Sequence, residues 1–141
     1  MTRWIRRYRV VAALAVLVLA IAGIWVWRVQ WEVQQVDGAI AMVQRTQIES
    51  STSNGINAYV TRSPAGCLQI NGATAVWPKG SVLVVRSDGV PGVRYKSKMY
   101  YAGDRTMMGP STDLTRAEAW IEGGWRVPKQ CGNKLTVVNF R

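Results

Sequence analysis

The chain has 141 residues, 18 lysines and arginines against 8 aspartates and glutamates, and no histidine, for a net charge of +10. A chain of this length has room for one domain. Without histidine it lacks the usual general base, the commonest metal ligand and a member of the catalytic triad. The sequence also contains no P-loop, no dinucleotide fingerprint and no calcium loop. We therefore expect a protein that is not an enzyme and holds no cofactor or metal, with a hydrolase acting through carboxylates as the alternative.

The N-terminus combines a basic segment, residues 1–9, with an apolar run from Val10 to Trp27 that has 18 residues and no charge. As an α-helix this run would span about 27 Å, close to the ~30 Å hydrocarbon core of a bilayer. Aromatic residues flank both ends of the run, where such rings favour the headgroup layer. The pattern predicts a transmembrane signal-anchor helix over residues 10–27 and makes the lipid bilayer the first expected partner.

Arginine placement predicts the orientation of this helix. Only Arg28 follows the helix directly, whereas four arginines precede it: Arg3, Arg6, Arg7 and Arg9. The positive-inside rule then places the N-terminus in the cytoplasm and the C-terminal domain outside the cell membrane, in a single-pass topology. The cluster is explained by orientation and anchoring, so we expect no nucleic-acid partner.

A cleaved signal peptide is the alternative for the same segment. Ala20-Ile21-Ala22 fits a cleavage site of small residues after a basic and then an apolar region. However, the apolar run continues to Trp27 and completes a full membrane span. Cleavage after Ala22 would convert the anchored protein into a secreted one.

Beyond the membrane, apolar residues recur at alternating spacings of four and three. They are Val29, Val33, Val36, Ile40 and Val43. This spacing is typical of a coiled-coil seam and predicts a helical stalk over residues 28–49. The stripe could serve self-association, or it could pack on the chain's own domain. The polar residues that follow predict a flexible linker over residues 50–56.

Residues 57–141 change to the pattern of a β domain. The expected strands are Ala58–Arg62, Cys67–Ile70, Thr74–Trp77, Ser81–Arg86, Val93–Tyr101 and Leu135–Phe140. Asn71-Gly72 is a strong hairpin signal, and Thr115 with Glu118 forms a capping box that predicts one short helix. The fold class is therefore a single transmembrane helix plus a small antiparallel, mainly-β domain, an OB-like partly open barrel or a sandwich.

Two surface features are candidate binding sites. In Val93–Tyr101, side-chain alternation places Arg94, Lys96 and Lys98 on one face, which suits anionic lipid headgroups or wall polymers, or is simply a solvated face. Trp125 lies between Gly124 and Arg126 and is the tryptophan most expected to be exposed for stacking on a glycan. The other domain tryptophans are more simply explained as core.

Cys67 and Cys131 both lie in the domain expected outside the membrane. That compartment is oxidising, so an even number of cysteines predicts one disulfide. Two cysteines without histidine do not make a usual zinc site, and there is no Cys-x-x-Cys redox motif.

The stretch from Gly66 to Val138 resembles small exterior domains of actinobacterial, or actinophage, membrane proteins and lipoproteins. The shared elements are Gly66-Cys67-Leu68, Val76-Trp77-Pro78-Lys79-Gly80, Gly103-Asp104 and Cys131 ahead of a last apolar strand. Thr106-Met107-Met108-Gly109 departs from the glycine run expected after Asp104. The resemblance implies the barrel and a Cys67–Cys131 disulfide, and it assigns no activity.

These features predict a membrane-anchored extracytoplasmic protein that is not an enzyme and binds an envelope protein or wall polymer. One alternative is an assembly subunit of pilin type, although Val10–Trp27 lacks the pilin leader motif and its glutamate. Another alternative is a phage-encoded protein that excludes superinfecting phage at the membrane.

Overall fold

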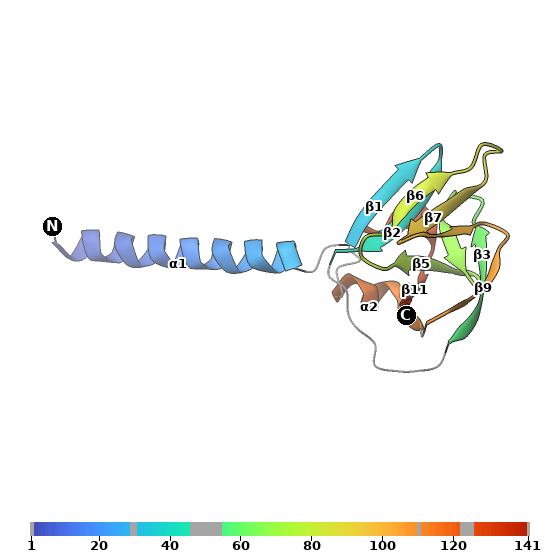
Figure 1. The fold of residues 1–141 in the computed structure, drawn as a ribbon. Coiled ribbons are helices and arrows are strands. Elements are labelled where there is room, and N and C mark those ends of the chain that lie inside the picture. Colours follow the sequence, from blue (N-terminus) through green and yellow to red (C-terminus); the bar gives the residue numbers. More distant parts are fainter. Residues whose placement is uncertain (1, 29–30, 46–54, 110, 122–125, 141) are drawn as a thin grey trace.

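The computed structural model describes residues 2–28, 31–45, 55–109, 111–121 and 126–140 (Figure 1). It has one long N-terminal helix, a mainly-β domain and one short helix, so the predicted fold class is confirmed. The long helix, α1 (Thr2–Arg28), is rich in alanine and leucine, the best helix formers. Its segment Trp4–Trp25 has a mean hydropathy of 2.2, and none of it is buried inside the described protein. By length and composition, α1 could cross a membrane.

The helical stalk predicted over residues 28–49 is wrong, because residues 31–44 form a β-hairpin. Strands β1 (Trp31–Val36) and β2 (Ala39–Gln44) pair antiparallel along their whole length. Between them Asp37 and Gly38 take φ values of +48° and +76°, and Asp-Gly is favoured in such left-handed turns. Of the residues that suggested a helical seam, Val33, Val36, Ile40 and Val43 lie on strands, and Val29 lies outside the described residues. Self-association through a stalk helix is therefore excluded for residues 31–44. The β domain begins at Trp31 instead of residue 57.

Most of the predicted linker, residues 50–54, lies outside the described residues. Its last residue, Ile56, belongs to strand β3. The linker prediction is therefore wrong at this end.

Eleven strands are found in the described chain, and they form two sheets. The larger sheet contains β1, β2, β3 (Ile56–Arg62), β4 (Leu68–Ile70), β5 (Ala73–Trp77), β9 (Arg105–Met108), β10 (Ser111–Thr115) and β11 (Lys134–Val138). The smaller sheet has the order β6-β7-β8, namely Val82–Val85, Pro91–Tyr95 and Lys98–Tyr101. The sheets share a core and do not close into a barrel, so the sandwich form of the prediction describes them better than the barrel form.

The larger sheet is mixed, not purely antiparallel as predicted. Strand β5 runs parallel to both β2 and β11, while the other pairings in the sheet are antiparallel, apart from one isolated parallel bridge between Ile40 and Cys67. All six residues of β2 are buried, because both faces of the sheet are covered there. Strands covered on both faces have continuous apolar sequences, which explains why β2 shows no strand-like alternation.

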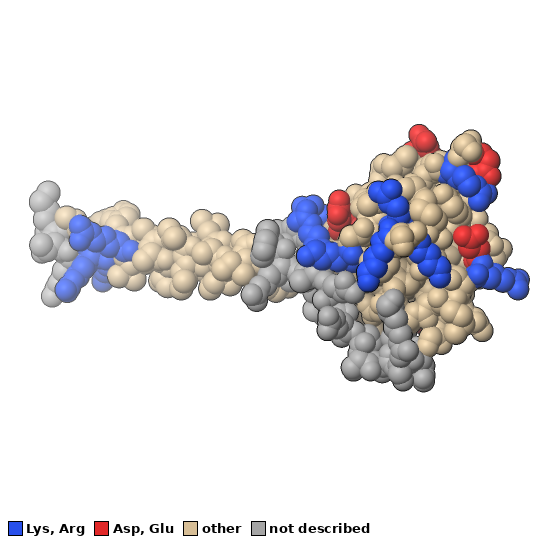
Figure 2. Space-filling model, in the orientation of Figure 1, with Lys and Arg blue, Asp and Glu red and all other residues tan. Residues whose placement is uncertain are grey.

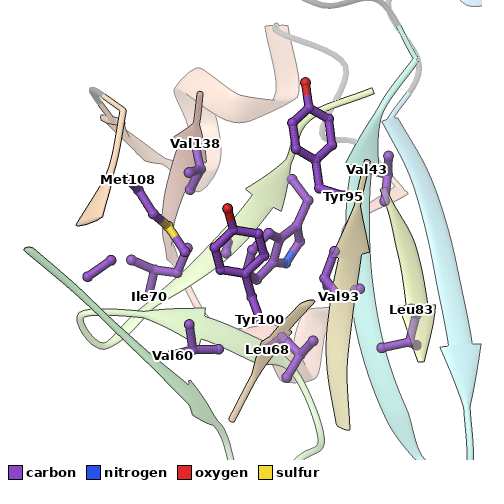
Figure 3. Close-up of a cluster of buried hydrophobic side chains, with 14 of the residues drawn as sticks. Val43, Val60, Leu68, Ile70, Leu83, Val93, Tyr95, Tyr100, Met108 and Val138 are labelled. Atoms are coloured by element: carbon purple, nitrogen blue, oxygen red, sulfur yellow. The ribbon is translucent and has the colours of Figure 1, made fainter. Parts of the chain in front are cut away.

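Two groups of buried side chains cover the two faces of the large sheet. The first lies between the sheets and includes Val43, Leu68, Trp77, Val93 and Tyr100 (Figure 3). Trp77 is fully buried in it, so its interpretation as core is confirmed. The second group lies on the opposite face of the sheet and includes the two cysteines.

The disulfide and α2 close this second face. Cys67 and Cys131 are bonded, as predicted, with Cα atoms 5.5 Å apart. Helix α2 (Arg116–Ile121) is capped as predicted, because the Thr115 amide donates to Glu118 and the Glu118 amide to the Thr115 hydroxyl. The Arg116 guanidinium donates to the carbonyl oxygens of Val127, Pro128, Lys129 and Gly132. It thereby holds the loop that presents Cys131.

Candidate binding site

The predicted strand Val93–Tyr101 is in fact a hairpin, and this brings two lysines together. Strands β7 and β8 reverse at Lys96-Ser97, where Lys96 has a φ of +55°. Tyr95 is the pairing partner of Lys98 across the turn. Lys96 and Lys98 are both exposed. They therefore flank one turn instead of following one another along the face of a strand.

Stacked aromatic rings lie beneath these lysines. The Phe140 ring stacks on Tyr95 and on Tyr100, with centroid distances of 5.0 Å and 4.7 Å. The Lys96 Nζ lies 5.5 Å from the Tyr95 centroid, and the Lys98 Nζ lies 5.3 Å from the Tyr100 centroid. Attraction between an ammonium group and a ring face favours these lysine positions.

The tyrosine hydroxyls complete the polar part of the site. Figure 3 shows both hydroxyl oxygens pointing in one direction, away from Val60 and Leu68. Burial, and the neighbouring Tyr95, raise the pKa of the Tyr100 hydroxyl above its ordinary value. Tyr100 therefore stays neutral at physiological pH and can donate a hydrogen bond to an anion.

A groove of about 440 Å³ adjoins these groups. Lys96, Lys98, Tyr95, Tyr100 and Phe140 line it, together with the end of β9, where Met107 is 63% exposed. The size suits one small ligand or one unit of a polymer. No carboxylate occurs among its described lining residues. The chemistry therefore favours an anionic group joined to an apolar or sugar-like body.

Of the four residues predicted for binding, the structure brings together Lys96 and Lys98. Arg94 is exposed on β7, paired with Val82 and Met99, and does not line the groove. Trp125 lies outside the described residues. Trp120 on α2 is 59% exposed, so the prediction that it belongs to the core is wrong.

The aromatic residues of the groove, Tyr95, Tyr100 and Phe140, were not predicted from the sequence. The error came from extending a single strand through Lys96-Ser97, which placed Tyr101 instead of Tyr100 on the buried face. Neither lysine nor serine favours a positive φ, so the pair gives little sign of a turn. The one available signal is the placement of Tyr95 and Tyr100 on either side of the two lysines.

Three carboxylates outside the groove have structural roles. Asp88 accepts two hydrogen bonds from Arg86, at 2.9 Å and 2.7 Å, which lower its pKa to about 2. Asp104 accepts from the Tyr101 amide at 2.8 Å, so both aspartates serve turns. Hydrogen bonds from Thr115 lower the pKa of the Glu118 carboxyl.

Comparison of the chain with protein-family models, curated proteins and solved structures gives no match. The resemblance to actinobacterial and actinophage exterior domains therefore stays a prediction.

Proposed function

We propose that this protein is a non-enzymatic binding module of the cell envelope, anchored by α1 with its β domain outside the membrane. Its ligand is an anionic, phosphodiester-bearing component of the envelope, bound in the groove beside Lys96 and Lys98. The observation that carries this proposal is the pair of ammonium groups over tyrosine rings, at a groove whose described lining contains no carboxylate.

The anchor and the disulfide support the location. Segment Trp4–Trp25 has the length and hydropathy of a membrane span. The arginines before the span favour a cytoplasmic N-terminus. A buried disulfide suits an oxidising compartment such as the cell exterior.

The side chains that line the groove support the proposal of an anionic ligand. A phosphodiester could accept hydrogen bonds from both ammonium groups, and each such charge-assisted bond is stronger than a neutral one. The rings beside it would contact the apolar or sugar part of the ligand. The described lining residues offer no group that would repel the anion.

Binding can be measured with the full-length chain in nanodiscs of neutral phosphatidylcholine. The probe is soluble poly(glycerol phosphate), with dextran as the uncharged control. We expect poly(glycerol phosphate) to bind and dextran not to bind. The K96Q/K98Q variant should bind the polymer about tenfold more weakly or worse, because it loses two charged donors.

The matched control is K129Q/K134Q, which removes the same charge from exposed lysines outside the groove. It should lose little affinity. Equal losses in the two variants would mean that the polymer responds only to net charge. That result, or the absence of any binding by the parent chain, would contradict the proposed site.

A further inference from the structure

The β1–β2 hairpin and the smaller sheet lie side by side with their ends aligned. The Gln34 side chain on β1 donates to the Ser81 carbonyl at 3.1 Å and accepts from the Leu83 amide at 2.7 Å. This fixes the start of β6 beside Gln34, the fourth of the six residues of β1. The turns β1–β2 and β6–β7 accordingly point the same way (Figure 1). The domain thus has a near end, which bears Trp31, and a far end, which bears these turns.

The two ends differ in charge. Far-end turns contain Asp37, Asp88 and Asp104, and arginines lie among them, including Arg86, which is paired with Asp88. At the near end, Lys79 occupies the β5–β6 turn and Lys96 and Lys98 flank the β7–β8 turn, all three exposed. Figure 2 shows the same contrast, with mostly blue side chains near the helix and both colours together on the opposite side.

On the strands and turns that the structure describes at this end, few acids offset the positive charge. Arg94 adds to this positive charge. It lies on β7, one residue before the last residue of that strand, and pairs with Val82. Glu32 on β1 is the acid that the strand register places there, across from Val43. The near end is therefore a predominantly positive surface.

The near end is also the end attached to α1. Helix α1 ends at Arg28 and β1 begins at Trp31, so three peptide units join them and reach no more than about 11 Å. Trp31 pairs with Gln44 at the near end of the hairpin. With α1 in a bilayer, this end must lie close to the headgroups. Charges on it are then within reach of the surface potential, which decays over about 8 Å in physiological salt.

We propose that Lys79, Lys96 and Lys98 bind anionic phospholipid headgroups of the same membrane that holds α1. This rests on the proposed function and names its ligand. A wall polymer approaching from outside would meet the far end and its aspartates first, whereas lipid phosphates lie against the near end. The exposed Met107 beside the groove supplies an apolar contact suited to the interface.

Lysine acylation provides a test on the full-length chain, because the sequence has five lysines and three are at the near end. Lys134 is the first residue of β11, and Lys129 lies in the short helical turn that ends at Cys131. Neither belongs to the near-end turns, so both report on general changes in reactivity. Acylation rates are measured by mass spectrometry in nanodiscs with and without phosphatidylglycerol.

Phosphatidylglycerol should slow acylation of Lys79, Lys96 and Lys98 by about threefold or more, and high salt should restore the rates. Rates at Lys129 and Lys134 should not change. Equal rates in both kinds of disc, or equal slowing of all five lysines, would overturn the proposal.

A third arm adds soluble poly(glycerol phosphate) to the neutral discs. If the polymer protects Lys96 and Lys98 while phosphatidylglycerol does not, the lipid assignment is overturned and the proposed function stands. If neither protects them, both are overturned.

Discussion

Cys67 and Cys131 are bonded although they lie 64 positions apart in the sequence. The bond joins the residue before β4 to the turn before β11, and both cysteines are buried. On the chain-entropy model a loop of this length gives about 4 kcal/mol of stability. We expect C67A/C131A to lower the free energy of unfolding by up to about that amount, measured by urea denaturation of the full chain in detergent. A loss below about 1 kcal/mol would contradict this role.

Gly66 packs against the β1–β2 turn so closely that a Cβ would collide with the carbonyl oxygen of Gly38. Its φ is +96°, and Gly72 has a similar φ of +84° with open space around it. Gly72→Ala should therefore cost about 1–2 kcal/mol from backbone strain alone. Gly66→Ala should cost clearly more, because the collision adds to the same strain. Equal decreases in the melting temperature of the two variants would contradict the close packing of Gly66 against the Gly38 carbonyl oxygen.

Gln34 joins the two sheets through its side-chain amide. Replacing it with alanine leaves the Leu83 amide without its partner in a partly buried place, at a cost of about 1–3 kcal/mol. Gln35→Ala is the matched control, since that neighbour is exposed on the same strand. Urea denaturation should separate the two variants. If they unfold at the same midpoint, Gln34 does not hold the sheets together.

The Asp88 carboxylate predicts a limited acid sensitivity of the β6–β7 turn. Its pKa is lowered to about 2 by hydrogen bonds from Arg86. A carboxyl whose folded pKa lies below its unfolded value stabilises the fold above about pH 4 and loses this contribution as the pH falls towards about 2. The parent chain should have the higher free energy of unfolding above about pH 4, and its difference from D88N should decrease as the pH falls towards about 2. An equal change in D113N, at an exposed carboxylate on β10, would assign the effect to general charge.

Sequence patterns succeeded where local chemistry determines the structure. Val10–Trp27 lies within α1, the Thr115–Glu118 capping box begins α2, and Asn71-Gly72 joins β4 to β5. The disulfide followed from the expected compartment and the cysteine count. These features depend on neighbouring residues or on simple counting.

Predictions from the sequence were wrong where tertiary contacts determine the local structure. The apolar spacing in residues 31–44 fits a helix, but burial of β2 on both faces and the Asp37-Gly38 turn make it a hairpin. The turn at Lys96-Ser97 places a lysine at a positive φ, which lysine does not favour. Phe140 joins the groove only because the end of the chain packs on the smaller sheet. A single sequence contains no local signal for such long-range packing.

In the proposed topology, α1 anchors the β domain on the outer side of the membrane. Every lysine lies after residue 78, so the only other primary amine in the chain is the N-terminal one. Intact spheroplasts can be treated with a membrane-impermeant amine-reactive biotin, and the labelled peptides of the membrane fraction then mapped by mass spectrometry. We expect full-length protein with labelled lysines and an unlabelled N-terminal amine. Lysines labelled only after lysis, or a chain released from the membrane without its first 22 residues, would contradict it.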